Sequence, residues 1–135
     1  MIRSSTAQSD NPWEDLVIAL LSVNQYSLER TYPLLEGIRA EKLADMQHLA
    51  AWTVPQIEER LKAAGCDRGS FMTGLFAQRL HSLGEYIERH YIARCELTLR
   101  SGDVRAIETL LLPVNGIGPV VLKKFYLLRG ISEPL

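Results

Sequence analysis

Residues 13–21 constrain the fold most, because they place apolar side chains on nearly every side of a helix. The residues around the start of this stretch are typical of a helix N-terminus. Asn11 suits the N-cap, Pro12 the first helical position and Glu14 the third. A helix that is apolar all round needs neighbours on every side. We therefore expect it to lie at the centre of the protein and to end near residues 23–24.

The remaining apolar spacing predicts further helices, and no segment alternates as a strand does over more than a few residues. Thr53 and Gln56 form a capping-box pattern, and Pro33 is expected early in its helix or at a bend. The expected helices cover residues 28–39, 41–51, 54–64, 70–92, 104–111 and 119–129. The sequence thus predicts an all-α fold, a compact orthogonal bundle of about seven helices.

Length and charge limit the organisation of the chain. Its 135 residues, 47% of them hydrophobic, suit one domain, which we place at residues 11–135 behind a flexible N-terminal tail at 1–10. The net charge of −1 excludes a strongly basic coat for nucleic acid. Residues 1–67 carry a net charge of −4 and residues 68–135 one of +3, so a basic face within the second half is compatible with the total.

The sequence gives no sign of a membrane span, a metal site or a cofactor. No apolar run is long enough to cross a bilayer, and residues 1–10 do not resemble a signal peptide. Cys66 and Cys95 lie far apart and fit reduced thiols in the cytoplasm, and the three histidines do not fall at a metal-ligand spacing. The aromatic side chains at helical spacing are expected in the core, namely Trp13, Phe71, Phe125 and Tyr126.

Residues 110–122 read as the end of one helix, a tight apolar turn and the start of another. Gly116 and Gly118 permit backbone angles and close approaches that a side chain would block. Ile117 lies between them and is expected to insert into the core, while Pro119 opens the next helix.

The start of that last helix predicts an anion site, because its first amides lack partners and the helix dipole favours negative charge there. Lys123 and Lys124 follow one turn later and add positive charge, which suits a nucleic-acid phosphate. The alternative is that the glycines and the proline form an ordinary turn between two helices.

Three segments resemble the helix-hairpin-helix DNA glycosylase superfamily, which includes endonuclease III and the 3-methyladenine glycosylases. Residues 111–122 resemble its hairpin, residues 13–25 its first barrel helix and following loop, and residues 61–69 its mid-domain turn. The segments occur in the family's order and cover about residues 11–130. The resemblance implies a bundle like the six-helix barrel half of those enzymes, with the helix-hairpin-helix motif at about 104–129.

In that family the enzyme flips a damaged base out of the duplex and cuts its glycosidic bond, while hairpin amides hold phosphates. The resemblance implies that Asn24, with Gln25 beside it, fills the gap left by the flipped base. A helix C-cap is the alternative role for Asn24. The full set of expected DNA contacts is Asn24, Gln25, Arg68, Asn115, Gly116, Ile117, Gly118, Val120, Lys123 and Lys124.

The sequence also departs from the family. Val120 stands where bifunctional members carry a nucleophilic lysine, so a Schiff-base route has no nucleophile here. The family's catalytic aspartate would fall just beyond Leu135 by its usual spacing. Glu133 is the acid nearest to that place in the sequence and is the candidate carboxylate, with simple solvation of the tail as its alternative role.

These observations favour a module that binds duplex DNA without base-sequence preference, prefers damaged or abasic sites, belongs to base-excision repair and does not catalyse in this form. One alternative is an active monofunctional glycosylase for alkylated or deaminated bases. Another is a helical interaction domain without a DNA role, dimerising through an exposed apolar surface. A cytoplasmic location is expected, associated with the nucleoid where DNA is bound.

Overall fold

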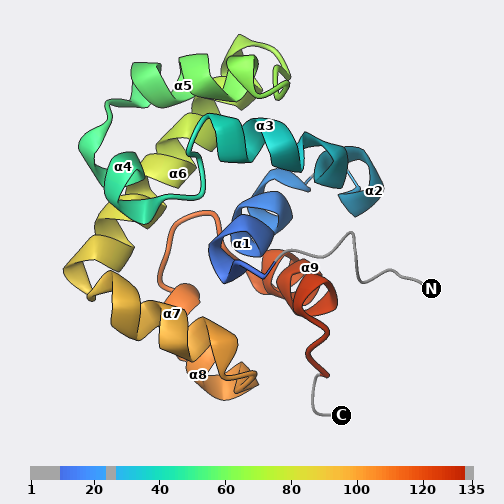
Figure 1. Cartoon of the computed structure of the whole chain (residues 1–135), viewed down its shortest axis with the longest axis vertical. Coiled ribbons are helices and arrows are strands. Elements are labelled where there is room, and N and C mark those ends of the chain that lie inside the picture. The colour runs from blue at the N-terminus through green and yellow to red at the C-terminus, as the bar shows by residue number, and fades with distance from the viewer. Residues whose placement is uncertain (1–9, 24–26, 133–135) are drawn as a thin grey trace.

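The computed structural model describes residues 10–23 and 27–132, and throughout these residues the regular structure is helical (Figure 1). The prediction of an all-α fold is therefore confirmed for the described residues. The elements in chain order are α1 (Pro12–Leu21), α2 (Leu28–Thr31), the short 3₁₀ helix η2 (Tyr32–Leu34), α3 (Leu35–Ala40), α4 (Met46–Ala51), α5 (Val54–Ala63), α6 (Ser70–Arg89), α7 (Ile92–Arg100), α8 (Val104–Leu111) and α9 (Pro119–Arg129).

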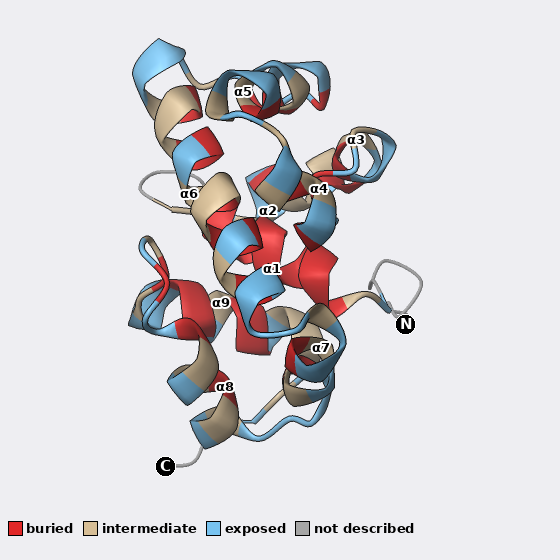
Figure 2. Ribbon diagram, turned by 90° about the vertical axis from the view of Figure 1, so that its left-hand side faces the viewer, coloured by how far each residue is buried: buried red, intermediate tan, exposed pale blue. Residues whose placement is uncertain are grey.

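Helix α1 lies at the centre of the molecule, as its all-round apolar sequence predicts. Every residue from Pro12 to Leu21 is buried, and α2, α3, α7 and α9 all pack against it. Figure 2 shows this buried ribbon enclosed by the other helices. The side chain of Asn11 accepts a hydrogen bond from the backbone N–H of Trp13 at 2.9 Å, so the predicted N-cap is confirmed.

Helix α6 is the longest element, with 20 residues, and it carries α4 and α5 on its surface. Gly84 permits the close approach to α4. A β-carbon at Gly84 would lie 2.7 Å from the backbone nitrogen of Ala50 and 2.7 Å from Cβ of Leu49. The contact with backbone atoms leaves little room for adjustment, so this position requires glycine for packing.

The segment between α1 and α5 is more broken than predicted. Instead of one helix over 28–39, Pro33 lies in the 3₁₀ turn η2 that separates α2 from α3. The helix expected over 41–51 begins only at Met46, because Lys42 adopts a left-handed conformation with φ of 58°. Asp45 then caps α4 by accepting from the backbone N–H of Gln47 and His48.

Helix α7 was not predicted. The helix expected over 70–92 ends at Arg89, because Tyr91 adopts φ of 67° and turns the chain into a new helix at Ile92. The left-handed conformation is energetically unfavourable for tyrosine. A tyrosine therefore does not mark the end of a helix in the sequence as a glycine does. The prediction that Phe71 is a core residue was also wrong, since 78% of its surface is exposed, whereas Trp13, Phe125 and Tyr126 are buried.

The caps of the later helices agree with the sequence prediction. The reciprocal capping box of Thr53 and Gln56 is present at the start of α5, and Gly130 ends α9 in the left-handed conformation. Cys66 and Cys95 are both buried free thiols. Among the described residues, no helix combines the length and apolarity needed to cross a membrane.

We predict that Gly84→Ala lowers the free energy of unfolding by about 2 kcal/mol, because the added methyl group overlaps the backbone of α4. The control is Gly74→Ala in the same helix, where the nearest atom is Oε1 of Glu58 at 3.7 Å. There the better helix propensity of alanine is expected to add up to about 1 kcal/mol. Urea unfolding measures both, and a change of the same sign in the two variants would contradict the packing argument.

Candidate nucleic-acid interface

Helices α8 and α9 are joined by a compact loop at residues 112–118, as the sequence predicts. The backbone N–H of Val114 donates to the carbonyl of Leu111 at 2.9 Å, and the N–H of Ile117 donates to the carbonyl of Val114 at 3.1 Å. These two bonds fold the loop on itself. The side chain of Ile117 is only 4% exposed, so its predicted insertion into the core is confirmed.

Gly116 lies where the loop turns back, with φ of 95°. Arg79 of α6 packs against it: a β-carbon on Gly116 would lie 2.7 Å from Cδ and 2.9 Å from Nε of Arg79. In the described part of the chain no carboxylate forms an ion pair with Arg79. The guanidinium group of Arg79 therefore lies beside the loop, and no acidic side chain in the described residues neutralises its charge.

The first amides of α9 lack hydrogen-bond acceptors within the described part of the chain. Gly118 is the N-cap and has no side chain to accept their hydrogen bonds, and Pro119 carries no N–H. The N–H groups of Val120 and Val121 have no acceptor among the described residues, whereas that of Leu122 donates to the carbonyl of Gly118 at 3.1 Å. A β-carbon on Gly118 would meet no atom within 4 Å, so the space in front of this residue is open.

Two of the expected DNA-binding cations have partners inside the protein. The ammonium group of Lys124 donates to the carbonyl of Ser22, and the guanidinium of Arg68 donates to the carbonyl of Leu21. Both side chains thus compensate the C-terminal end of α1, where unpaired carbonyls and the helix dipole favour positive charge. Lys123, in contrast, is exposed.

The other expected site residues differ in their surroundings. Asn115 and Val120 are exposed, Gly116 and Gly118 are half-buried, and Ile117 faces the core. Asn24, Gln25 and Glu133 lie outside the described residues. Arg79 was not predicted, because it is distant from the loop in sequence and belongs to no motif around it.

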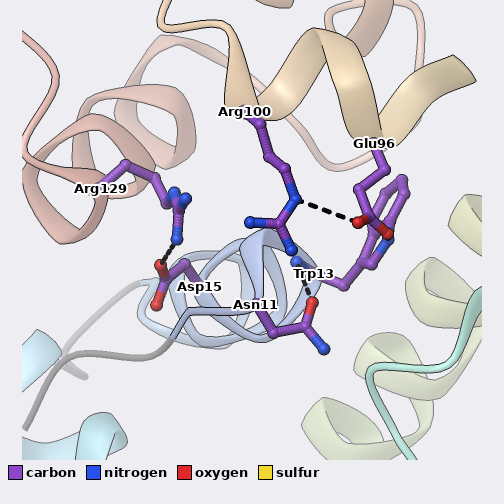
Figure 3. Close-up of polar contacts among 6 residues, drawn as sticks. All are labelled: Asn11, Trp13, Asp15, Glu96, Arg100 and Arg129. Carbon is purple, nitrogen blue, oxygen red and sulfur yellow. Dashed lines mark hydrogen bonds and ion pairs between the residues drawn. The ribbon is translucent and has the colours of Figure 1, made fainter. Parts of the chain in front are cut away.

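An ion pair at the far end of α1 fixes the direction of α9. Nη1 of Arg129 lies 3.0 Å from Oδ2 of Asp15, and the side chain of Asp15 is only 1% exposed (Figure 3). Arg129 is the last residue of α9 and Lys124 precedes it by five residues, whereas Asp15 lies in the first turn of α1 and Ser22 caps its end. The two contacts therefore hold α9 antiparallel to α1 and place the α9 N-terminus near the end of α1.

Burial raises the pKa of Asp15 to about 6, although its hydrogen bond and charge interaction with Arg129 act in the opposite direction. The desolvation of a carboxylate inside the helical bundle outweighs the attraction of a single guanidinium. This pair is thus a position at which the packing of α1 depends on pH.

A cleft of about 400 Å³ opens at the start of α1, between α3, α4 and α7. Its charged groups are largely engaged: Arg39 donates to both carboxylate oxygens of Glu14 at 2.9 Å, and Nε1 of Trp13 donates to Glu96 at 2.9 Å. Arg100 also donates to Glu96, as Figure 3 shows. Carboxylates held in this way serve the packing of α1 against α3 and α7.

A scan against protein-family models gives no match to this chain, and searches of curated proteins and of solved structures give none either. The described residues also contain no group of three or more histidine, cysteine or acidic side chains that would hold a metal ion.

We predict that Asp15→Asn changes the pH dependence of stability. The pKa of Asp15 is about 6 in the folded protein against an ordinary value of 3.8, so between these pH values the folded state holds a proton that the unfolded state has released. The stability contributed by this group is therefore complete below about pH 4 and falls by about 3 kcal/mol as pH rises through 6.

Because asparagine does not titrate, the stability of the variant relative to the parent is expected to rise by about 3 kcal/mol between pH 4 and pH 7. Urea unfolding at unit intervals of pH measures this difference directly. A constant difference across that range would contradict the assignment of a raised pKa to Asp15.

Proposed function

We propose that this protein binds duplex DNA without base-sequence preference, with a bias toward damaged or abasic sites, as a module of base-excision repair. In this proposal residues 104–129 form a helix-hairpin-helix motif of the DNA glycosylase type. The support comes from the sequence resemblance and from the compact loop between α8 and α9.

The observation that carries the proposal is the set of unpartnered donors beside the loop. The N–H groups of Val120 and Val121 lack acceptors in the described residues, Arg79 lies against Gly116 without an acidic partner, and Lys123 is exposed nearby. Backbone amides and two cations suit phosphate oxygens. Phosphate contacts fix position on a duplex but carry no base information, which favours binding independent of sequence.

Catalysis is not part of the leading proposal. Val120, at the place of the family's nucleophilic lysine, is apolar and 63% exposed, so it supplies no Schiff base. The alternative is a monofunctional glycosylase for alkylated or deaminated bases, with Glu133 as its carboxylate. Release of a free base from damaged duplex would support that alternative, and unchanged release by Glu133→Gln would remove Glu133 from it.

The direct test is fluorescence anisotropy with a duplex that contains a stable abasic analogue and with the same duplex intact. We expect tighter binding to the abasic duplex and weaker binding at higher salt, because cation–phosphate contacts release counterions. Gly118→Ala is expected to lower affinity about five- to tenfold by intruding on the open space before the amides. Arg79→Gln is expected to have an effect of the same size.

Two features make these variants informative. Gly118 has φ of −123°, which alanine adopts readily, so Gly118→Ala should keep the unfolding midpoint of the parent. Lys62→Gln is the charge control, because Lys62 is an exposed cation on α5, a helix that lies far from α9 along the long axis of Figure 1. Its ion pairs with Glu58 and Glu59 are long, at 3.9 Å each. Equal affinity of the parent, Gly118→Ala and Arg79→Gln would rule out binding through this loop.

A second candidate function is self-association through α9. Val120 and Leu127 are 63% and 65% exposed, and their spacing of seven residues puts them on the same side of the helix. These two exposed apolar side chains, with the exposed Lys123 between them on the same side of α9, suit a small contact with a second copy of the chain. Sedimentation equilibrium would show a dimer that Leu127→Lys dissociates; a monomer at all concentrations would exclude this function.

A further inference from the structure

A second pocket lies where α6 ends and α7 begins. It has a volume of about 280 Å³, and it is lined by Arg89, His90, Tyr91, Arg94, Cys95, Thr98 and Leu110. The pocket runs along one face of α7, because its lining includes residues three and four apart, namely Tyr91, Arg94, Cys95 and Thr98. Helix α8 contributes Leu110. The volume of the pocket lies just below the range of about 300–1,000 Å³ that is usual for ligand pockets, so it suits only a small molecule.

The charged side chains of this pocket are all basic. Arg89 and Arg94 line it, no carboxylate does, and neither arginine forms an ion pair with a described acidic residue. The cleft at the start of α1 differs in this respect, since acids and bases line it together. Guanidinium groups favour carboxylate and phosphate oxygens because their N–H groups match the spacing of two oxygens.

The walls of the pocket are held in place by contacts around Tyr86. Its hydroxyl group donates to the carbonyl of Leu110 at 2.6 Å, and its ring stacks on that of His90 with 4.2 Å between centroids. His90 Nδ1 lies 2.7 Å from the carbonyl of Tyr86. Burial raises the pKa of the Cys95 thiol although Arg94 acts in the opposite direction, so the thiol adds no negative charge to the pocket.

Tyr91 lines the pocket and has a backbone conformation that glycine would adopt at lower cost. Its φ is 67°, and 70% of its surface is exposed, so the ring gains little from burial in the fold. Strained residues of this kind concentrate at binding sites, where the side chain is needed in one place. The exposed ring offers a flat apolar surface beside two arginines.

We propose that this pocket binds a small organic anion, whose carboxylate or phosphate group pairs with Arg89 and Arg94 and whose ring lies against Tyr91 and Leu110. The pocket is separate from the loop that precedes α9, and the proposal does not depend on DNA binding. Carboxylate and phosphate share the charge and the paired oxygens that the arginines recognise.

The test is a titration of the full chain, followed by amide chemical shifts, with benzoate, phenyl phosphate, benzyl alcohol and inorganic phosphate at constant ionic strength. Benzoate or phenyl phosphate is expected to bind with a dissociation constant of about 1 mM, and the stronger of the two identifies the preferred head group. Benzyl alcohol, which has the ring without the charge, and inorganic phosphate are expected to bind at least about tenfold more weakly. The shifts should centre on residues 89–98 and Leu110.

Three variants and one control separate ligand binding from stability. Arg89→Gln and Arg94→Gln are each expected to weaken benzoate binding about fivefold or more, whereas Arg105→Gln, an exposed arginine outside this pocket, leaves it unchanged. Tyr91→Gly is expected to abolish the preference for a ring. Its unfolding midpoint should be no lower than that of the parent, because glycine relieves the left-handed conformation.

The proposal is overturned by any of the following results. One is no binding of benzoate or phenyl phosphate at about 10 mM, a second is equal binding of benzyl alcohol, and a third is unchanged affinity in both arginine variants. Shifts centred on the loop before α9 would also overturn it, because the anion would then occupy the other site.

Discussion

The rest of the structure depends on the complete burial of α1. A helix enclosed on all sides has no exposed face for its charged residues, so Asp15 is carried into the core although its carboxylate prefers water. Arg129, at the end of α9, offsets part of this cost, and the ion pair fixes how α9 lies along α1. The place of the loop before α9 is therefore a consequence of how the central helix is enclosed.

The C-terminal end of α1 also needs partners, because its last carbonyl groups are buried with the helix. The cations that supply them are no longer free to bind a ligand at the surface. The carbonyls of Leu21 and Ser22 receive the side chains of Arg68 and Lys124. These two cations are part of the net positive charge of residues 68–135, but their side chains bind the carbonyl groups at the C-terminal end of α1. The positive charge left beside the loop comes from Lys123 and Arg79, of which only the first lies in the motif.

The elements that the sequence predicts correctly are those whose determining residues are neighbours in the chain. The caps at Asn11 and Thr53 and the left-handed Gly130 depend on local chemistry, and each was predictable from a few residues. The start of α7 depends instead on Tyr91 taking a conformation that its side chain disfavours. The approach of Arg79 to Gly116 joins residues on different helices, so it follows from the packing of α6 and has no signal in the local sequence.

The two proposed sites each include an arginine of α6, and we expect each to bind its anion independently of the other. Arg79 lies in the middle of this helix and Arg89 at its end, ten residues apart, which corresponds to about 15 Å along the axis. The same interval turns the side chains by about 80° around the helix, so the two arginines point to different sides. A phosphate held beside Gly116 and an anion held beside Tyr91 would thus have separate partners on one rigid element, and occupation of one site does not require the other.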